Sequence, residues 1–322
     1  MIRVLIGGSP CVEWSIAKKG REVKAEGKGW ELFKCYLRAK ELYQPDYFLY
    51  ENNYSISNDI KKSISSTLGQ PCLHINSALL SAQNRDRIYV TNIPNIQLPK
   101  DKLISFADIA ENNIAGAEGK PFCVAQRGRQ LEGKKEWVQK YEKRTDNKSN
   151  ALTTVQKDVM YCVKVKDSIL DYTFEVKDYK TSVIKNNELK SYEINLSDGK
   201  YKVRNLTILE RRRLQTIPDS YKMLGKSKDI RLLGNGWTVD VIAHILSYIP
   251  NIENEEIEIL SMFDGMACGM IALKKLGVNV KRYLASEIDE YAIETVSLNY
   301  PEIIHIGDAF NIEQELSEYV KI

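Results

Sequence analysis

One cysteine stands in a position suited to nucleophilic attack. The short apolar run at residues 4–6 ends at Gly7-Gly8, and this pattern predicts a buried parallel strand that leads into a loop. In that loop Pro10 precedes Cys11, and a basic stretch begins at Lys18. Nearby cations favour the thiolate, so a thiol held by a rigid proline is a candidate nucleophile. A lone cysteine is more often a small buried hydrophobic residue, so its neighbours must decide between the two interpretations.

A carboxyl group and two guanidinium groups are expected beside that thiol. Glu51 ends an apolar run that begins at Tyr47, and the motif Gln83-x-Arg85-x-Arg87 leads into another predicted strand. Strand ends at one edge of an α/β sheet converge. The sequence therefore predicts one cleft that contains a nucleophile, an acid and a cation.

The C-terminal segment has the pattern of a nucleoside-binding site. A predicted strand at residues 257–263 is followed by a turn of mostly small residues, 264–269, and the next two predicted strands end at Glu287 and Asp308. Small residues let the backbone approach a ligand, and an acid after the second strand can accept hydrogen bonds from ribose hydroxyls. The sequence contains neither a triphosphate-binding Gly-x-x-x-x-Gly-Lys-Ser/Thr loop nor the dinucleotide pattern Gly-x-Gly-x-x-Gly. Tight helix–strand packing is the alternative explanation for the small residues.

The elements that would position these groups alternate between strand and helix. Helical spacing of apolar residues is found at residues 30–42, 239–248 and 270–276, and short apolar runs lie between such segments. This alternation predicts a doubly wound α/β sheet. Residues 95–203 are instead polar, rich in Lys and Asn, and marked by short alternating stretches, which predicts a small irregular β-rich insertion.

Composition and charge limit the classes of protein. The chain has 322 residues, of which 43% are hydrophobic and 28% charged, typical of a globular chain with one large domain and a smaller one. No stretch approaches the ~20 apolar residues that a membrane span needs. The net charge is +3, yet residues 251–322 hold 14 acidic and 5 basic residues. A polyanionic partner should therefore meet the first part of the chain, above all residues 118–157 with 10 basic and 5 acidic residues.

The 6 cysteines are scattered and have no metal-type spacing. This arrangement predicts neither a disulfide framework nor a metal site, and it favours reduced thiols in a cytoplasmic protein.

Taken together, the motifs resemble those of the DNA cytosine-5 methyltransferase family. Pro10-Cys11, Glu51-Asn52 and Gln83-x-Arg85-x-Arg87 are similar to its catalytic motifs, in their usual order. Residues 204–221 resemble its long late motif, and 234–239 resemble its last motif. Phe263-x-Gly265, Glu287 and Gly307-Asp308 resemble its first three. The similarity covers nearly the whole chain except residues 95–200. The sequences at residues 263–269 and 236–239 resemble those of vertebrate de novo-type enzymes and phage relatives in particular.

The order of these motifs is unusual, because the family begins with the cofactor motifs and this chain ends with them. Joining Ile322 to Met1 would restore the usual order, with a helix over 313–320 leading into the first strand. The resemblance thus implies a circularly permuted, Rossmann-like S-adenosylmethionine-dependent methyltransferase sheet with a small irregular β-rich target-recognition domain. The expected division is a catalytic half at 1–95, the target-recognition domain at 96–203, late-motif helices at 204–250 and a cofactor-binding half at 251–322.

The resemblance also implies roles for individual residues. Cys11 would attack carbon 6 of a cytosine flipped out of double-stranded DNA, Glu51 would protonate ring nitrogen 3, and Arg87 would contact the base. S-adenosylmethionine would be held by Pro10, Asn235, Trp237, Phe263, Asp264, Gly265, Cys268, Gly269, Glu287, Ile288 and Asp308. Further DNA contacts are expected from Ser9, Ser15, Arg85, Arg127, Arg129, Lys148 and Thr153.

Within the cofactor set, Phe263 and Ile288 would pack against the adenine and Asp308 would accept from its amino group. Glu287 would hold the ribose, and Asn235 and Trp237 would border the methionine part. The chain departs from the family at Val12 (usually Gln), at Asn53 (usually Val) and at Ala267-Cys268 (usually a glycine pair). No reacting group is lost, but base-flipping contacts are affected.

Two other functions remain open at this point: an RNA cytosine-5 methyltransferase of the same fold, and a catalytically silent DNA-binding relative. The basic insertion fits a DNA target better than an RNA target, and intact Cys11, Glu51 and Arg87 argue against a silent protein. We expect a monomer without a membrane partner, in the cytoplasm of a bacterium or of a phage-infected bacterium. The sequence leaves open whether a cognate restriction endonuclease accompanies it.

Overall fold

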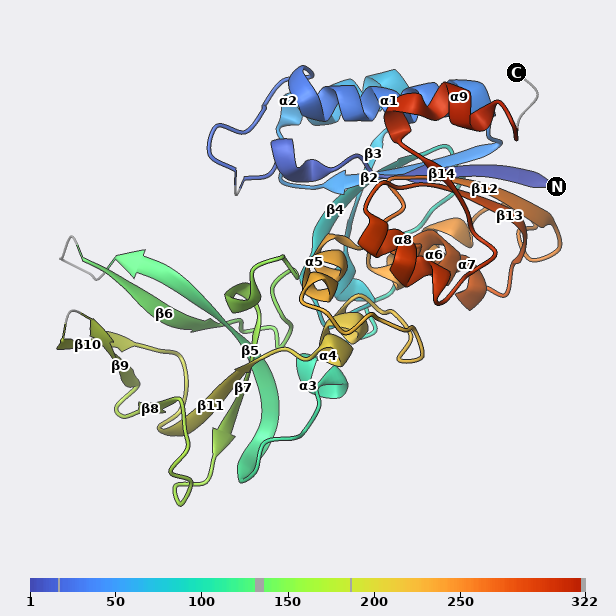
Figure 1. Ribbon diagram of the computed structural model, residues 1–322. Helices are drawn as coiled ribbons and strands as arrows, with labels where there is room; N and C mark the ends of the chain where they lie inside the picture. The colour runs from blue at the N-terminus through green and yellow to red at the C-terminus, as the bar shows by residue number, and fades with distance from the viewer. Residues whose placement is uncertain (17, 131–135, 186, 320–322) are drawn as a thin grey trace.

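The structure, a computed structural model, describes residues 1–16, 18–130, 136–185 and 187–319. A seven-stranded sheet between two layers of helices forms the larger part, and a five-stranded and a two-stranded sheet form the smaller part beside it (Figure 1). Among the described residues, no helix is both long and apolar enough to cross a membrane.

The seven-stranded sheet combines strands from both ends of the chain. Its order is β14-β13-β12-β1-β2-β4-β3. The strands are β1 (Ile2–Gly7), β2 (Tyr47–Asn53), β3 (Cys72–Asn76), β4 (Asp86–Thr91), β12 (Glu256–Met262), β13 (Asn279–Ser286) and β14 (Ile304–Gly307). All neighbours from β14 to β2 are parallel, whereas β4 runs antiparallel to both β2 and β3. The predicted α/β sheet is confirmed, with the additional finding of an antiparallel edge.

Strands β1 and β12, from opposite ends of the chain, lie side by side. They pair in parallel register from Ile2 with Ile257 to Gly7 with Met262. The Met1 amino group forms an ion pair with Glu255 at 2.7 Å. The expectation that the first strand and the strand after residue 256 share one sheet is therefore confirmed. Ile322 lies outside the described residues, and the helix expected at 313–320 is shorter, α9 (Ile312–Leu316).

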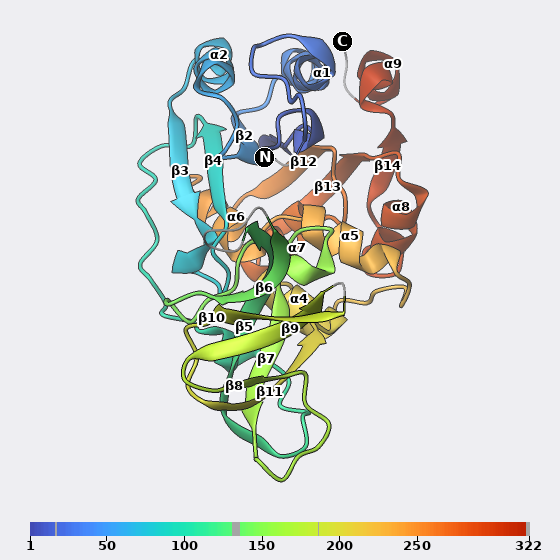
Figure 2. The same cartoon turned by 90° about the vertical axis from the view of Figure 1, so that its left-hand side faces the viewer.

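Helices cover both faces of this sheet (Figures 1 and 2). One face carries α9 with α1 (Gly27–Tyr43) and α2 (Asn58–Leu68). The other carries α5 (Lys228–Asn235), α6 (Val239–Leu246), α7 (Cys268–Lys275) and α8 (Glu290–Ser297). Each layer buries its own apolar cluster against the sheet, which is why the central strands read as continuous hydrophobic runs.

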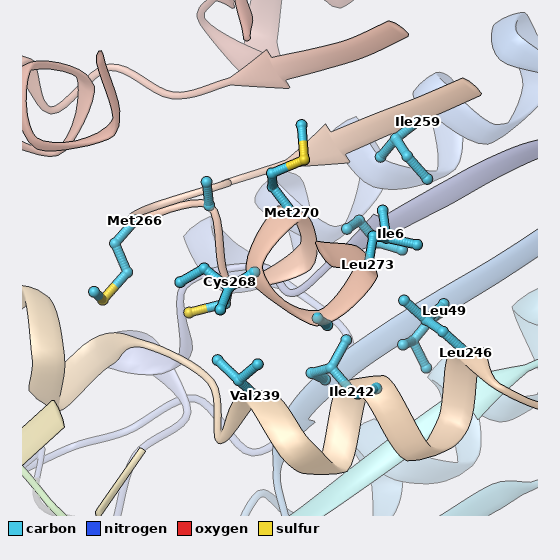
Figure 3. Close-up of a cluster of buried hydrophobic side chains, with 14 of the residues drawn as sticks. Ile6, Leu49, Val239, Ile242, Leu246, Ile259, Met266, Cys268, Met270 and Leu273 are labelled. Carbon is cyan, nitrogen blue, oxygen red and sulfur yellow. The ribbon is translucent and has the colours of Figure 1, made fainter. Parts of the chain in front are cut away.

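Helix α7 packs against the centre of the sheet and against α6 (Figure 3). Its first turn needs a glycine, because a Cβ at Gly269 would lie 2.1 Å from Cδ1 of Ile6 and 2.8 Å from the Tyr283 hydroxyl. The small residues of this turn therefore have a packing role. That role does not exclude close approach of a ligand on the turn's other side.

The smaller part is built from the segment that the sequence marked as irregular and β-rich. Its five-stranded sheet has the order β6-β5-β7-β11-β8, with all pairs antiparallel. These strands are β5 (Ala117–Gln130), β6 (Trp137–Lys143), β7 (Met160–Val165), β8 (Phe174–Val176) and β11 (Gly199–Asn205). The hairpin of β9 (Lys180–Lys185) and β10 (Glu188–Glu193) forms the two-stranded sheet.

Short helices join the two parts. They are α3 (Phe106–Ile109) and α4 (Ile208–Leu214), and α4 starts with a capping box in which Thr207 and Glu210 satisfy each other's backbone N–H groups. Short 3-10 turns complete the chain: η1 (Cys11–Glu13), η2 (Ser77–Leu79), η3 (Gln156–Asp158) and η4 (Ala309–Asn311).

Candidate active site

One row of paired residues crosses the large sheet and sets the position of the site. Each residue of the row pairs with the next across five adjacent strands, β14, β13, β12, β1 and β2. The residues are Gly307, Ser286, Met262, Gly7 and Tyr50. In each of these strands the next residue belongs to a motif identified in the sequence: Asp308, Glu287, Phe263, Gly8 and Glu51. The segment predicted to bind a nucleoside and the segment predicted to carry the catalytic acid therefore meet at one edge of one sheet, although they lie at opposite ends of the chain.

Strand β4 brings its arginine to the same edge because it runs antiparallel. Glu51 pairs with Tyr89, so Arg87, two residues earlier, lies beyond the end of the row. Arg87 Nε is 2.8 Å from Glu51 Oε1, and the two side chains are only 13% and 11% exposed. The predicted proximity of carboxyl and guanidinium is confirmed.

The second carboxylate oxygen of Glu51 has a donor of its own. Trp237 Nε1 donates to Glu51 Oε2 at 3.0 Å. Trp237 follows α5 and lies in the motif 234–239. The last of the family-like motifs therefore contacts Glu51 of the Glu51-Asn52 motif. Each carboxylate oxygen has two lone pairs, and one donor on each leaves acceptor capacity for a substrate.

The loop that carries the cysteine is tied to β2 by a small buried network. The Ser9 hydroxyl lies 2.6 Å from the Tyr50 hydroxyl, and Asn52 Nδ2 donates to the Ser9 carbonyl at 3.1 Å and to the Tyr50 hydroxyl at 3.0 Å. A Cβ at Gly8 would lie 2.6 Å from the Glu51 carbonyl oxygen, so this close approach requires glycine. The backbone of Cys11 begins η1 directly after this loop, and its side chain lies outside what the structure describes.

The segment after Cys11 is anchored internally and exposes apolar side chains. Trp14 is fully buried and donates through Nε1 to Glu22 Oε2 at 3.2 Å, and the same carboxylate accepts from the backbone N–H groups that begin α1. Val12 and Ile16 are 63% and 68% exposed. Ser15, for which the sequence predicts a DNA contact, lies between these two on the same stretch.

Arg85 is a buried connector in this structure. It is 4% exposed, and its guanidinium donates to the carbonyl oxygens of Leu152 at 2.9 Å, Gly234 at 3.2 Å and Gly236 at 2.9 Å. Direct contact between Arg85 and DNA would require breaking these bonds. That contact stays a prediction, and the observed role is to hold the smaller part of the molecule and the Trp237 loop together.

The turn after β12, residues 263–269, contains strained backbone positions and donates a hydrogen bond to the carboxylate that follows the next strand, and we call it the cradle. Phe263 and Ala267 both have left-handed backbone conformations, with φ of 58° and 57°. Such strain in non-glycine residues is typical of functional turns. Glu287 Oε2 accepts from the Gly265 N–H at 2.8 Å, and its Oε1 accepts from the N–H groups of Ile288 and Asp289. Ile288, the residue after Glu287, is 68% exposed. Its apolar side chain is therefore accessible to a ligand.

Two polar groups of this region lack partners among the described residues. Asp264 Oδ1 accepts from Ser261 and Tyr283 at 2.6 Å and 2.7 Å, whereas its shielded Oδ2 has no hydrogen-bond partner there. Burial raises the pKa of the Asp264 carboxyl to about 6. Both ring nitrogens of His305, on β14, are likewise shielded and unpartnered within that part of the chain, and burial lowers the pKa of its imidazole.

The remaining residues predicted to bind the cofactor differ in their exposure. Cys268 and Gly269 are buried at the start of α7, and burial raises the pKa of the Cys268 thiol to about 12. Pro10 and Asn235 are exposed at the same edge of the sheet. The Asp308 carboxylate accepts from the Phe310 N–H at 3.0 Å, and Phe310 itself is 59% exposed.

Four predicted DNA contacts lie in the smaller part. Arg127 and Arg129 are on β5, and Arg129 makes a two-point ion pair with Glu142. Lys148 donates to the carbonyl oxygens of Ala78, Ser81 and Ile104, so its ammonium joins the two parts of the molecule. The Thr153 hydroxyl donates to Asp158 at 2.7 Å. The DNA-binding roles stay predictions.

Sequence reasoning assigned no role to a buried glutamine pair behind the site. Gln83 Nε2 donates to Gln215 Oε1 at 3.0 Å, and Gln215 Nε2 donates to the Gly236 carbonyl at 2.9 Å. Both glutamines are fully buried. Their motifs were identified, since Gln83 begins the arginine motif and Gln215 lies in residues 204–221. Their mutual contact could not be read from a separation of 132 positions.

Comparison with known proteins shows the family of the chain. The profile of the family described as C-5 cytosine-specific DNA methylase matches residues 1–251, and the chain belongs to that family. The chain is similar to DNA (cytosine-5)-methyltransferase DRM2 of Arabidopsis thaliana, with 24% identity over 258 residues, covering 76% of this chain and 37% of that protein. It is also similar to DNA (cytosine-5)-methyltransferase DRM1A of Oryza sativa subsp. japonica, with 30% identity over 93 residues, covering 27% and 20%. The chain thus spans little more than a third of the Arabidopsis protein's length.

Proposed function

We propose that the protein is a DNA cytosine-5 methyltransferase that uses S-adenosylmethionine and acts on a specific sequence of double-stranded DNA. The observation that carries the proposal is the row across the large sheet, because it unites Glu51 and the cysteine loop with Glu287 and Asp308. Membership of the C-5 cytosine-specific DNA methylase family and the names of the two plant relatives support the same reaction.

The chain's own groups are arranged for activating a cytosine. In the proposed reaction the Cys11 thiolate adds to carbon 6 of a base flipped out of the helix, and the protonated Glu51 carboxyl donates to ring nitrogen 3. The electron pair released by this addition makes carbon 5 nucleophilic. After carbon 5 is methylated, a base takes up its proton and the thiolate leaves, which restores the double bond between carbons 5 and 6, and ring nitrogen 3 returns its proton to Glu51. Arg87 holds the carboxyl of Glu51 for the proton transfer.

The residues of the cradle fit the proposed cofactor. Glu287 suits ribose hydroxyls, Phe263 and the exposed Ile288 suit the faces of an adenine, and Asp308 suits its amino group. The unpartnered Asp264 Oδ2 provides a further acceptor on the same turn. When bound, S-adenosylmethionine supplies an electrophilic methyl group. The buried Cys268 and Gly269 shape the floor of the cradle by packing against the sheet.

A circular permutation explains the order of the motifs. The parallel pairing of β1 with β12 supports it, because the C-terminal segment completes the sheet that the N-terminal strand begins. The family match ends at residue 251, before the segment with Phe263, Glu287 and Asp308, as expected if that segment has been moved. Under this proposal residues 1–95, 204–250 and 251–322 form the methyltransferase domain.

Residues 96–203 are then the target-recognition domain. Supporting this role, the smaller part contains both β-sheets outside the catalytic sheet and the basic stretch 118–157. Base-edge contacts need a module that reaches the grooves, whereas a flipped base is processed in the catalytic sheet.

The test is methylation itself. Cells that express the protein should contain 5-methylcytosine at one recurrent sequence by bisulfite sequencing, and the purified protein should transfer labelled methyl groups to duplex DNA. Transfer to RNA but not to DNA would favour an RNA enzyme of the same fold. DNA binding without transfer would show a catalytically silent relative.

A further inference from the structure

The side chain of Trp237 contacts the acid of the active site instead of only lining the cofactor cradle. Its indole N–H donates to Glu51 Oε2 at 3.0 Å, while Arg87 Nε lies 2.8 Å from Oε1. The final torsion of a glutamate side chain is broad, so one donor on one oxygen leaves the carboxyl plane free to turn. Two donors from different elements, one on each oxygen, remove that freedom.

The loop that carries Trp237 is held on several sides. The carbonyl of Gly236 accepts from both Arg85 and Gln215, each at 2.9 Å, and the Thr238 hydroxyl donates to Gln215 at 3.0 Å. The Cys268 thiol, 3.9 Å away, donates to the carbonyl of Trp237 itself. Residues on both sides of the tryptophan are thus held by the residue before β4, the C-cap residue of α4 and the first residue of α7. These hydrogen bonds hold the backbone from which the indole N–H reaches Glu51.

We propose that Trp237 is a positioning residue for Glu51, which sets the plane of the carboxyl group for proton transfer to the flipped base. The inference rests on the proposed function, because it assigns Trp237 an effect on that reaction. The ring of Trp237 remains able to border the cofactor with its carbon atoms. The N–H group and the ring surface of Trp237 therefore have separate roles, and different substitutions can abolish each role.

The variant Trp237→Phe removes the N–H group and keeps an aromatic ring. At saturating DNA and S-adenosylmethionine we expect single-turnover methyl transfer to slow about 10- to 100-fold, as for a misplaced reacting group. The equilibrium affinity for S-adenosylmethionine should stay within about twofold, because the ring surface remains. Trp237→Leu should also weaken cofactor binding. Trp30→Phe is the matched control, since Trp30 lies on α1, which covers the opposite face of the sheet.

A double-mutant cycle separates positioning of Glu51 from a general structural effect. If Trp237 acts through Glu51, the Trp237→Phe change should slow transfer no further in a Glu51→Gln background. An equal loss in both backgrounds would show that the tryptophan acts independently of the glutamate. Wild-type speed in Trp237→Phe, or a loss confined to cofactor affinity, would also overturn the inference.

The contact itself can be read without any activity. In protein labelled with nitrogen-15 in its 4 tryptophans, the indole resonance that disappears in Trp237→Phe belongs to Trp237. This resonance should shift and lose protection from hydrogen exchange in Glu51→Ala. A resonance unmoved by Glu51→Ala would disprove the contact. If the contact is present and the wild-type protein transfers no methyl group to DNA, the proposed function fails, and with it the catalytic role of Trp237.

Discussion

Arg87 Nε lies 2.8 Å from Glu51 Oε1 at a place where solvent reaches little of either side chain. Taking two charges out of water is costly, and a well-packed apolar pair is often at least as stable. A shielded ion pair at the end of the row of strand-end residues is therefore better explained by chemistry than by stability. The guanidinium compensates the charge of the carboxylate and fixes one of its two oxygens, and in the proposed reaction it does so until the flipped base enters.

The first prediction removes that guanidinium. Arg87→Met leaves Glu51 with a single donor and an uncompensated charge when ionised. We expect methyl transfer to fall by about 10²- to 10⁴-fold, the range of a lost general acid. The free energy of unfolding should fall by about 3 kcal/mol, as when one partner of a shielded pair is deleted. Single-turnover assays and urea denaturation measure the two effects. A variant with wild-type transfer would show that Arg87 does not support the acid.

The sequence predicted the large sheet well, because its strands are short apolar runs that end at the motifs identified in the sequence. The expected strands at 4–6 and 257–263 lie within or overlap β1 and β12. The proximity of Glu51 to Arg87 followed from the rule that strand ends converge. The antiparallel direction of β4 was not predicted, because an apolar run carries no information about strand direction.

Roles that depend on side-chain partners were harder to predict. The family resemblance implied a DNA contact for Arg85, yet its guanidinium donates to three carbonyl oxygens that lie far from it in the sequence. Lys148 presents the same case. A single sequence shows that a residue is charged but does not show what folds around it. The contact of Trp237 with Glu51, across 186 positions, was likewise hidden.

The second prediction concerns Arg85 as a connector. Arg85→Met would remove the arginine donor from the carbonyl oxygens of Leu152 and Gly234, whereas the Gly236 carbonyl would keep its hydrogen bond from Gln215. Each unsatisfied buried group costs about 1–3 kcal/mol, so we expect the variant to lose at least about 2 kcal/mol. Arg129→Met is the control, because its exposed pair with Glu142 contributes less than about 1 kcal/mol. Equal urea midpoints for the two variants would contradict the connecting role.

The third prediction uses the raised pKa of Asp264. Burial raises it to about 6, from an ordinary value of 3.8. Between these two values the folded state binds more protons than the unfolded state, so stability is highest below about pH 4 for this group and decreases as the pH rises toward 6. Asp264→Asn removes this titration. The wild type should therefore lose unfolding free energy relative to the variant as the pH rises from 4 to 6, and above pH 6 the difference should stay constant.

Urea denaturation at several pH values measures that difference. Its full size is at most about 3 kcal/mol, from 1.36 kcal/mol for each pKa unit. Asp289→Asn is the control, because Asp289 is a nearby acid at the start of α8 whose side chain is 32% exposed. A constant difference across the range would show that Asp264 titrates normally.

The fourth prediction concerns the recognised sequence. If residues 96–203 read the DNA, exchanging them for the corresponding segment of a family member with a known target should transfer that target to the chimera. The row of strand-end residues across the large sheet stays intact in such a chimera, because all of its strands lie outside the exchanged segment. Bisulfite sequencing of DNA from expressing cells gives the methylated sequence. Continued methylation of the original sequence would place recognition elsewhere in the chain.

The fifth prediction concerns the covalent step. Release of the enzyme requires loss of the proton on carbon 5, and a fluorine at that carbon cannot leave as a cation. A duplex with 5-fluorocytosine at the target should therefore trap the protein, and only when S-adenosylmethionine is present. Cys11→Ser should abolish both the adduct and methyl transfer, while DNA affinity stays largely intact, because phosphate contacts supply much of the binding.

Cys72→Ser is the matched control for that experiment, since Cys72 is a free cysteine on β3 outside the row of strand-end residues. It should form the adduct at the wild-type rate. Glu51→Gln should form it far more slowly, because an amide cannot deliver a proton to ring nitrogen 3, and its cofactor affinity should change little because Glu287 and Asp308 are separate groups. Mass spectrometry of the digested adduct identifies the attached residue. Attachment to a cysteine other than Cys11, or an active enzyme that leaves no adduct, would show that the reaction follows another course.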